Sequence, residues 1–195
     1  MKIKEGDVVT SGQIFATCPE TSLIEHRSLI PVGIKGKVVK AVSDGAYTVK
    51  DVLAVIEDEN THEQKEVTLM QKWAIRTPRP IKGREPITMP LITGQRVVDT
   101  MFPIAKGGSS ALPGGFGAGK TMMQHQIAKW CDADIIIYVG CGERGNEMTQ
   151  ALEEFSELTD PKSGKPLLDR TVLIANTSNM PVAAREASIY TAVTI

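Results

Sequence analysis

The sequence has few cysteines, few aromatic residues and no excess of either charge. Cys18, Cys131 and Cys141 are far apart and form no C-x-x-C pair, which argues against a disulfide framework and against a zinc site. Lysine and arginine number 22 against 23 aspartates and glutamates, and no basic run reaches five residues. This balance gives no reason to expect nucleic acid or a membrane surface as a partner. A reducing, cytosolic setting fits best.

Long apolar runs are also missing. Nowhere do 18 consecutive apolar residues occur, and residues 1–6 carry charges without an apolar run behind them. Neither a transmembrane helix nor a secretory leader is therefore expected. With 195 residues, of which 42% are hydrophobic and 23% charged, the chain has the composition of one or two globular domains with a core.

Residues 1–70 carry a strand pattern. Short apolar runs such as Val8-Val9, Val38-Val39 and residues 52–56 are separated by Gly, Asp and Ser turn signals, and no helix-length pattern appears. The sequence predicts a small all-β, sandwich-like or barrel-like module here. The polar stretch 57–66 reads as a solvated loop at the edge of this module.

Two half-motifs in this module, at residues 6–9 and 31–38, resemble the sandwich of biotinyl and lipoyl carrier domains. Those domains present a modified lysine, but no lysine lies between Pro19 and Pro31. The resemblance therefore implies a fold and not a carrier function. One alternative for the whole chain is a carrier domain fused to a generic nucleotide hydrolase. It would require a modified lysine in residues 1–70.

Residues 77–103 hold five prolines, which excludes a long helix and indicates an extended connection over the surface. Within it, residues 93–99 predict a short helix capped by Thr93. His26, His62 and His125 are single histidines for which the sequence indicates no ligand partners.

The segment 114–121 fits G-x-x-x-x-G-K-[ST], the phosphate-binding loop. Glycines can adopt φ > 0 and turn consecutive backbone N–H groups inward around phosphate oxygens, and the helix that follows adds its partial positive charge. Lys120 would lie along the β- and γ-phosphates, and the Thr121 hydroxyl would bind Mg²⁺. The candidate nucleotide-binding residues are Gly114, Gly115, Phe116, Gly117, Ala118, Gly119, Lys120 and Thr121.

An alternation of strands and helices surrounds this loop. Residues 111–113 give a weak strand signal before it, and Met123, Ile127, Trp130 and Cys131 form the apolar stripe of a helix after it. The run 134–139 predicts a strand buried on both faces of a parallel sheet.

A second helix is predicted around residues 148–155, with Asn146 as its N-cap. Another strand is predicted over 171–175, and an Ala-rich helix begins near Pro181. The order indicates an α/β fold, a parallel sheet with helices on both faces and ligands at the carboxyl ends of its strands.

Glu143 and Arg144 follow the strand predicted over 134–139 and should face the same crevice as Lys120. The Glu143 carboxylate could polarise an attacking water, while Arg144 could orient it or contact phosphate oxygens. Taken without context, a Gly-Glu-Arg turn is common, and its glutamate and arginine would be interpreted as a surface salt bridge. The position at the end of a strand favours a catalytic role for Glu143. Glu147 reads as a solvated residue of the next helix's first turn.

Four stretches together resemble the catalytic A subunit of V-type and A-type rotary ATPases: 114–121, 137–148, 157–161 and 174–186. The resemblance covers essentially the whole chain, and residues 1–70 then resemble that subunit's β "bulge" module, the non-homologous region. Residues 71–195 would be part of a RecA-like P-loop domain. Ala118 stands where eukaryotic relatives have a cysteine, which favours a prokaryotic relative.

The resemblance implies ATP or ADP with Mg²⁺ as ligands, and Glu143, Lys120 and Arg144 as catalytic residues. It implies non-catalytic B subunits in an alternating A3B3 ring, stalk subunits, and coupling of ATP hydrolysis or synthesis to proton or sodium transport by a separate membrane sector. The location would be cytoplasmic and peripheral to the membrane.

The metal-orienting aspartate, the adenine pocket and the C-terminal helical domain of that family have no counterpart in these 195 residues, so we expect an internal fragment. The alternative function is a non-catalytic, phosphate-binding or structural piece without turnover. Appreciable ATPase activity of the isolated chain is not expected.

Overall fold

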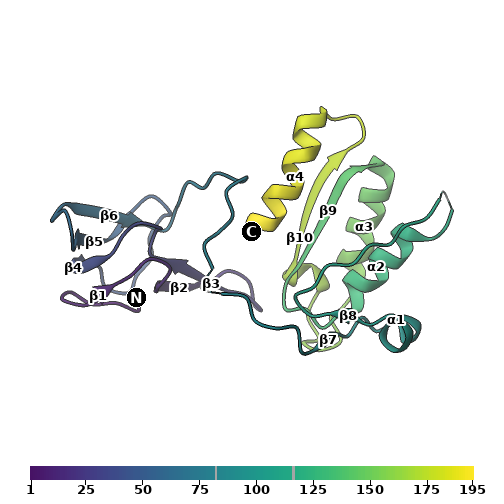
Figure 1. The fold of residues 1–195 in the computed structure, drawn as a ribbon, viewed down its shortest axis with the longest axis horizontal. Helices are drawn as coiled ribbons and strands as arrows, with labels where there is room; N and C mark the ends of the chain where they lie inside the picture. The colour runs from purple at the N-terminus through teal and green to yellow at the C-terminus, as the bar shows by residue number, and fades with distance from the viewer. Residues whose placement is uncertain (82, 116) are drawn as a thin grey trace. The chain divides into compact units, whose positions relative to one another are not determined.

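The computed structural model describes residues 1–81, 83–115 and 117–195. The chain forms two compact units, Met1–Ala74 and Ile75–Ile195, coloured purple to blue and teal to yellow in Figure 1. The sequence placed the boundary after residue 70. Each unit has its own buried core and is described separately below.

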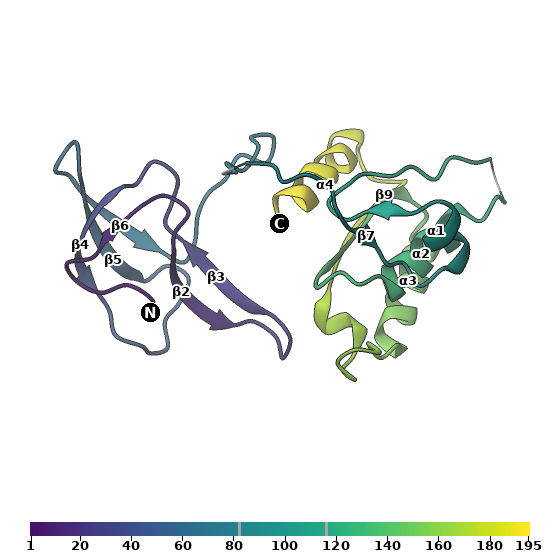
Figure 2. The same ribbon diagram turned by 60° about the horizontal axis from the view of Figure 1, so that its bottom comes forward.

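The first unit consists of strands and loops, as the sequence predicts. Four antiparallel strands form a sheet in the order β1-β4-β5-β6, and β2 pairs with β3 in a hairpin whose turn projects away from the other strands (Figure 2). Side chains on one face of each strand fill the core, led by Phe15, Val38 and Ile56, which are almost fully buried. The strands are β1 (Val8–Val9), β2 (Ile14–Pro19), β3 (Glu25–Leu29), β4 (Gly36–Ala41), β5 (Val52–Asp58) and β6 (Gln64–Thr68).

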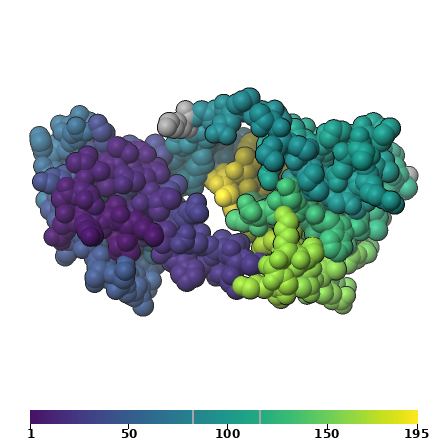
Figure 3. Space-filling model, turned by 90° about the horizontal axis from the view of Figure 1, so that it is seen from below, coloured from purple at the N-terminus to yellow at the C-terminus, as the bar shows by residue number. Residues whose placement is uncertain are grey.

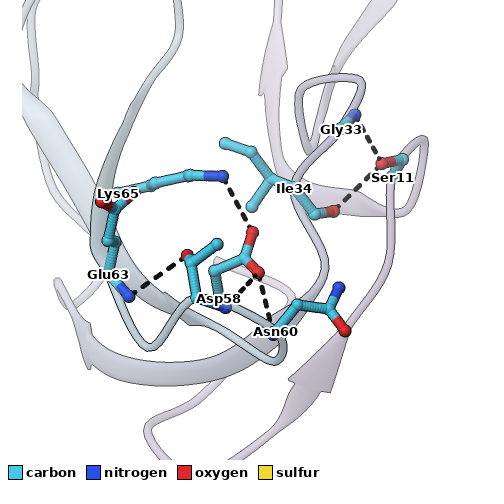
Figure 4. A network of polar contacts seen from close by, with 8 residues as sticks. Ser11, Gly33, Ile34, Asp58, Asn60, Glu63 and Lys65 are labelled. Carbon is cyan, nitrogen blue, oxygen red and sulfur yellow. Dashed lines mark hydrogen bonds and ion pairs between the residues drawn. The ribbon is translucent and has the colours of Figure 1, made fainter.

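Asp58 closes the turn between β5 and β6 (Figure 4). Its Oδ2 accepts a hydrogen bond from Lys65 Nζ at 2.8 Å, and its Oδ1 accepts the backbone N–H of Asn60 at 3.0 Å. The Lys65 bond, followed by the backbone donors of Asn60 and Thr61, lowers the pKa of Asp58 to about 2. The stretch expected to be a solvated loop is therefore a turn anchored by a buried carboxylate.

A depressed carboxyl pKa stabilises the folded module above its ordinary value of 3.8, and this contribution is lost as pH falls towards about 2. We expect Asp58→Asn to lower the urea midpoint of the first unit at pH 7 and to flatten its decline between pH 4 and pH 2. Asp51→Asn, in an exposed turn, should keep the wild-type decline. A decline unchanged by Asp58→Asn would contradict the assignment.

The second unit is built on two parallel strands. β9 and β10 pair from Thr171 opposite Ile136 to Thr177 opposite Glu143, and Figure 1 shows α4 on one side of them with α2 and α3 on the other. The parallel pairing and the two helical layers confirm the α/β prediction. The elements are β7 (Pro90–Leu91), α1 (Arg96–Met101), β8 (Ile104–Ala105), α2 (Lys120–Trp130), β9 (Ile136–Glu143), α3 (Gly145–Glu157), the 3-10 helix η1 (Leu167–Arg170), β10 (Thr171–Thr177) and α4 (Val182–Thr194).

The proline-rich segment is extended, as predicted, and Figure 3 shows it in teal at the surface of the second unit, beside the green residues that follow it. Its short helix does not use Thr93 as a cap. Instead Asp99 reaches back from α1 and accepts hydrogen bonds from the Thr93 hydroxyl at 2.7 Å and from the backbone N–H groups of Thr93 and Gly94. A side chain of the helix, Asp99, therefore binds the turn that precedes it, whereas the prediction had a side chain of the turn, Thr93, binding the start of the helix.

Three other local predictions were wrong. Residues 111–113 form no strand, and within the described residues β9 pairs with β10 alone. The strand predicted to begin at residue 134 begins at Ile136. Ile137 and Val139, which were predicted to be buried, are only half-buried, since one edge of β9 lacks a neighbour there. The N-cap of α3 is Arg144, because the chain turns into the helix two residues before Asn146.

Glycine at position 140 brings α3 close to the sheet. A Cβ placed on Gly140 would lie 2.2 Å from Met148 Sδ, so the Met148 side chain in its present position needs a glycine there. Met148, Ala151 and Phe155 are buried along α3, whereas Leu152, which the apolar stripe included, is 46% exposed. Among the residues that the structure describes, no helix is long and apolar enough to cross a membrane.

Candidate phosphate-binding site

The loop before α2 has the backbone that its sequence predicts. Gly117 and Gly119 have φ of +75° and +79°, a region that L-residues with a side chain rarely adopt. Gly119 is the N-cap of α2 and makes no side-chain capping bond, so the first N–H groups of the helix have neither a side-chain cap nor an intrahelical acceptor. An uncapped helix start that follows a glycine loop fits an anion such as phosphate. Phe116 lies outside the described residues.

Lys120 folds back over this loop. Its Nζ donates to the carbonyl oxygen of Gly114 at 2.5 Å, and its exposed position leaves the ammonium accessible to a ligand. A Cβ on Gly115 would meet nothing within 4 Å, so the space beside the loop is open. Thr121 stands half-buried in the first turn of α2 and can offer its hydroxyl.

Glu143 is the last residue of β9 and pairs with Thr177 at the end of β10. The backbone N–H of Ser178 donates to the carbonyl oxygen of Glu143 at 3.0 Å, which ties together the two chain segments that leave the sheet. Arg144 follows as the exposed N-cap of α3. The carboxyl ends of both strands therefore lie at one edge, as expected for a ligand-binding α/β sheet.

A second carboxyl group faces Glu143. The hydrogen bond with Glu147 is the main cause that raises the pKa of Glu143, and burial and the negative charge of Glu147 add to it. The positive charges of Lys120 and then Arg144 oppose this rise. Glu147 is thus not the solvated residue that the sequence indicated, but one half of a carboxyl pair that can share a proton.

Three of the residues predicted from the sequence, Lys120, Glu143 and Arg144, interact electrostatically. Lys120 from the phosphate loop and Arg144 from the start of α3 both act on the carboxyl group of Glu143. A cationic loop and a protonatable carboxyl group at one sheet edge can hold an anion beside a group that accepts a proton from water.

Arg185 of α4 reaches the same strand end, which the sequence did not indicate. A Cβ on Gly142, whose φ is +80°, would lie 3.2 Å from Arg185 Nη1, so the bare glycine makes room for the guanidinium. Cys141 Sγ donates to the carbonyl oxygen of Arg185 at 3.2 Å. Gly142 itself, between Cys141 and Glu143, was the sequence feature that could have indicated the close approach of Arg185.

The described side chains offer few ligands for a metal ion. Within 1–81, 83–115 and 117–195 there is no group of three or more His, Cys, Asp or Glu side chains that could hold an ion. A single hydroxyl ligand, from Thr121, fits an ion held mainly by phosphate oxygens and water, which is the usual mode for Mg²⁺.

Comparison with known proteins gives matches over both units. Residues 94–195 match the "ATP synthase alpha/beta family, nucleotide-binding domain", and residues 1–76 match the "ATPsynthase alpha/beta subunit barrel-sandwich domain". The A subunit of the A-type ATP synthase from Methanopyrus kandleri is 58% identical over 194 residues, which is 100% of this chain and 33% of the relative.

The V-type ATP synthase alpha chain of Halothermothrix orenii is 59% identical over 197 residues, again 100% of this chain and 33% of the relative. The corresponding A-type protein of Thermococcus sibiricus, also an A subunit, is 58% identical over the same shares. The chain therefore spans about a third of the length of the relatives that it matches.

The carboxyl pair generates a prediction about titration. Glu147→Gln removes a negative charge and the proton-sharing partner, so the pKa of Glu143 should fall, helped by Lys120 and Arg144. A carboxyl pKa raised by folding stabilises the fold at low pH, and this contribution is lost as pH rises from 4.5 through the raised value. Glu147→Gln should reduce the amount of folding stability that is lost over this pH range.

The measurement is a pH titration of the Glu143 side-chain carboxyl carbon by NMR. Glu153→Gln, on the exposed face of α3, is the matched control and should leave the midpoint of Glu143 in place. The same midpoint in wild type and Glu147→Gln would show that the two carboxyl groups do not share a proton.

Proposed function

Because this chain belongs to the ATP synthase alpha/beta family, we propose that it binds ATP and ADP with Mg²⁺ at the loop 114–121 and serves ATP hydrolysis or synthesis in a rotary ATPase. In the longer protein, the reaction would be coupled to transport of protons or sodium ions across a membrane. The observation that carries the proposal is the glycine loop, with positive φ at Gly117 and Gly119, that leads into the uncapped start of α2 at Lys120. The Lys120 charge also acts on the carboxyl group of Glu143, the candidate base at the strand ends.

Each residue then has a separate role. The backbone N–H groups of residues 114–119, Phe116 and Ala118 included, would surround the phosphates, and Lys120 would leave the Gly114 carbonyl to lie along the β- and γ-phosphates. The Thr121 hydroxyl would be a ligand of Mg²⁺, which when bound neutralises phosphate charge.

Glu143, once ionised, would orient the attacking water and accept its proton. The hydrogen bond with Glu147 is the main cause that raises its pKa. Phosphate beside Lys120 and Arg144 would raise this pKa further, because it neutralises the two cations that favour the charged form of Glu143. Arg144 would contact phosphate oxygens or hold the carboxylate in place.

The larger assembly follows from the family. Residues 1–70 would be the β bulge module and residues 71–195 part of the nucleotide-binding domain of a catalytic A subunit. That subunit would alternate with B subunits in an A3B3 ring, contact central and peripheral stalk subunits, and lie on the cytoplasmic side of the membrane. ATP binding without turnover by this chain alone would fit the alternative of a phosphate-binding piece.

Binding is tested with the 195-residue chain by calorimetric titration of MgATP. Lys120→Ala should weaken the affinity on the order of a hundredfold, since it removes a charge-assisted contact to phosphate. Lys162→Ala, which removes an exposed lysine of the same unit, should leave the affinity unchanged. Equal binding by Lys120→Ala and wild type would place the nucleotide elsewhere.

Glu143→Gln separates binding from chemistry in an assembled enzyme that contains this segment. We expect MgATP affinity to stay within about twofold and hydrolysis to fall by a factor of roughly 10² to 10⁴, the usual contribution of a general base. Single-turnover hydrolysis and equilibrium binding should be measured on the same preparation. Loss of binding together with hydrolysis would make Glu143 a structural residue.

A further inference from the structure

A second polar cluster lies behind the phosphate loop, where α2, β9 and α3 meet. His125 of α2 is only 3% exposed, and its Nε2 lies 2.8 Å from the hydroxyl oxygen of Tyr138 in β9. Its Nδ1 lies 3.8 Å from Glu154 Oε2 in α3. The sequence indicated no ligand partner for His125, and it did not indicate these two neighbours, a hydroxyl group and a carboxylate.

The neighbours of His125 define its protonation. Glu154, Lys129 and Glu147 are the charged groups that act on it, and burial, the largest cause, lowers its pKa, so the ring is neutral at pH 7. The Glu154 carboxylate on the Nδ1 side favours a proton on that nitrogen. Nε2 is then the acceptor, and the Tyr138 hydroxyl donates to it.

The rings of His125, Tyr138 and Phe155 pack edge to face, with centroid separations of 5.3 to 6.2 Å. Lys129 Nζ donates to Glu154, and Gln150 Nε2 donates to the other oxygen of that carboxylate at 2.9 Å. His125 Nδ1 makes no hydrogen bond within the described residues, so the bond to Tyr138 is the polar contact that holds the imidazole ring.

The two bonded residues stand at equal sequence distances from the two halves of the site. His125 follows Lys120 by five residues along one helix, and Tyr138 precedes Glu143 by five residues along one strand. The helix is continuous from Lys120 to His125, and β9 pairs with β10 without a break from Ile136 to Cys141, where a register shift precedes Glu143. A bond between His125 and Tyr138 therefore fixes α2 relative to β9.

We propose that the hydrogen bond between His125 and Tyr138 is a positioning device that sets the place of Lys120 and the phosphate loop relative to Glu143. This inference deepens the proposed function and rests on it. An apolar pair would fill the same space, but it would allow α2 to slide along β9; the directed bond removes that freedom. His125 and Tyr138 are positioning residues, since neither would touch the nucleotide.

The test uses the 195-residue chain with Tyr138→Phe, which removes one hydroxyl and keeps the packed ring. Tyr190→Phe removes the same atom from α4, on the other side of the sheet, and serves as the matched control. Ile127→Val in α2 controls for a general loss of stability. Two readouts are needed: amide NMR shifts of residues 117–121 without nucleotide, and MgATP affinity by calorimetry.

We expect Tyr138→Phe to shift the loop amides and to weaken MgATP binding roughly tenfold at a temperature where all variants are folded. The two controls should do neither. His125→Gln should have a similar effect, and combining it with Tyr138→Phe should add little, because both remove one bond.

Loop amides and affinity that change no more in Tyr138→Phe than in Ile127→Val would overturn the inference. Additive effects of the two substitutions would overturn it as well. A wild-type chain that binds no MgATP, while Tyr138→Phe still shifts the loop amides, would contradict nucleotide binding by this chain alone and support the link between the cluster and the loop.

Discussion

The parallel pairing of β9 and β10 is the constraint on which the candidate site depends. Because the two parallel strands stay paired up to Thr177 and Glu143, with one register shift just before that pair, the segments that leave them emerge at one edge. There the first turn of α3 brings Glu147 against Glu143, and Arg185 of α4 occupies the space left by Gly142. The site thus comes from strand ends and not from a dedicated domain, which is why its residues are scattered through the second half of the chain.

The backbone of the glycine loop and the position of Glu143 at a strand end could be predicted from the sequence because local rules specify them. Glycine at 117 and 119 is needed for the backbone itself, and a helix that starts at Lys120 follows from the residues behind it. The carboxyl pair could not be predicted in the same way. A glutamate in a first helical turn is ordinary, and only the tertiary position of α3 turns Glu147 towards Glu143.

The errors in the fold have a common physical cause. Trp130 was placed on the apolar face of α2 but is 40% exposed, whereas His125 and Lys129 are buried on it. A period of 3.6 residues finds the buried face only when that face is apolar, and here it carries a histidine and a lysine that partners in β9 and α3 compensate. Asn146 and Thr93 were likewise assigned by residue type, while the chain path makes Arg144 and Gln95 the N-caps.

Gly140 gives the second unit an unexpected kind of vulnerability. It carries no functional group and lies three residues before Glu143, yet the Met148 side chain occupies the space that a Cβ at position 140 would need. Met148 is the residue after Glu147. A methyl group added at position 140 would therefore displace a side chain next to the carboxyl pair without altering any ionisable residue.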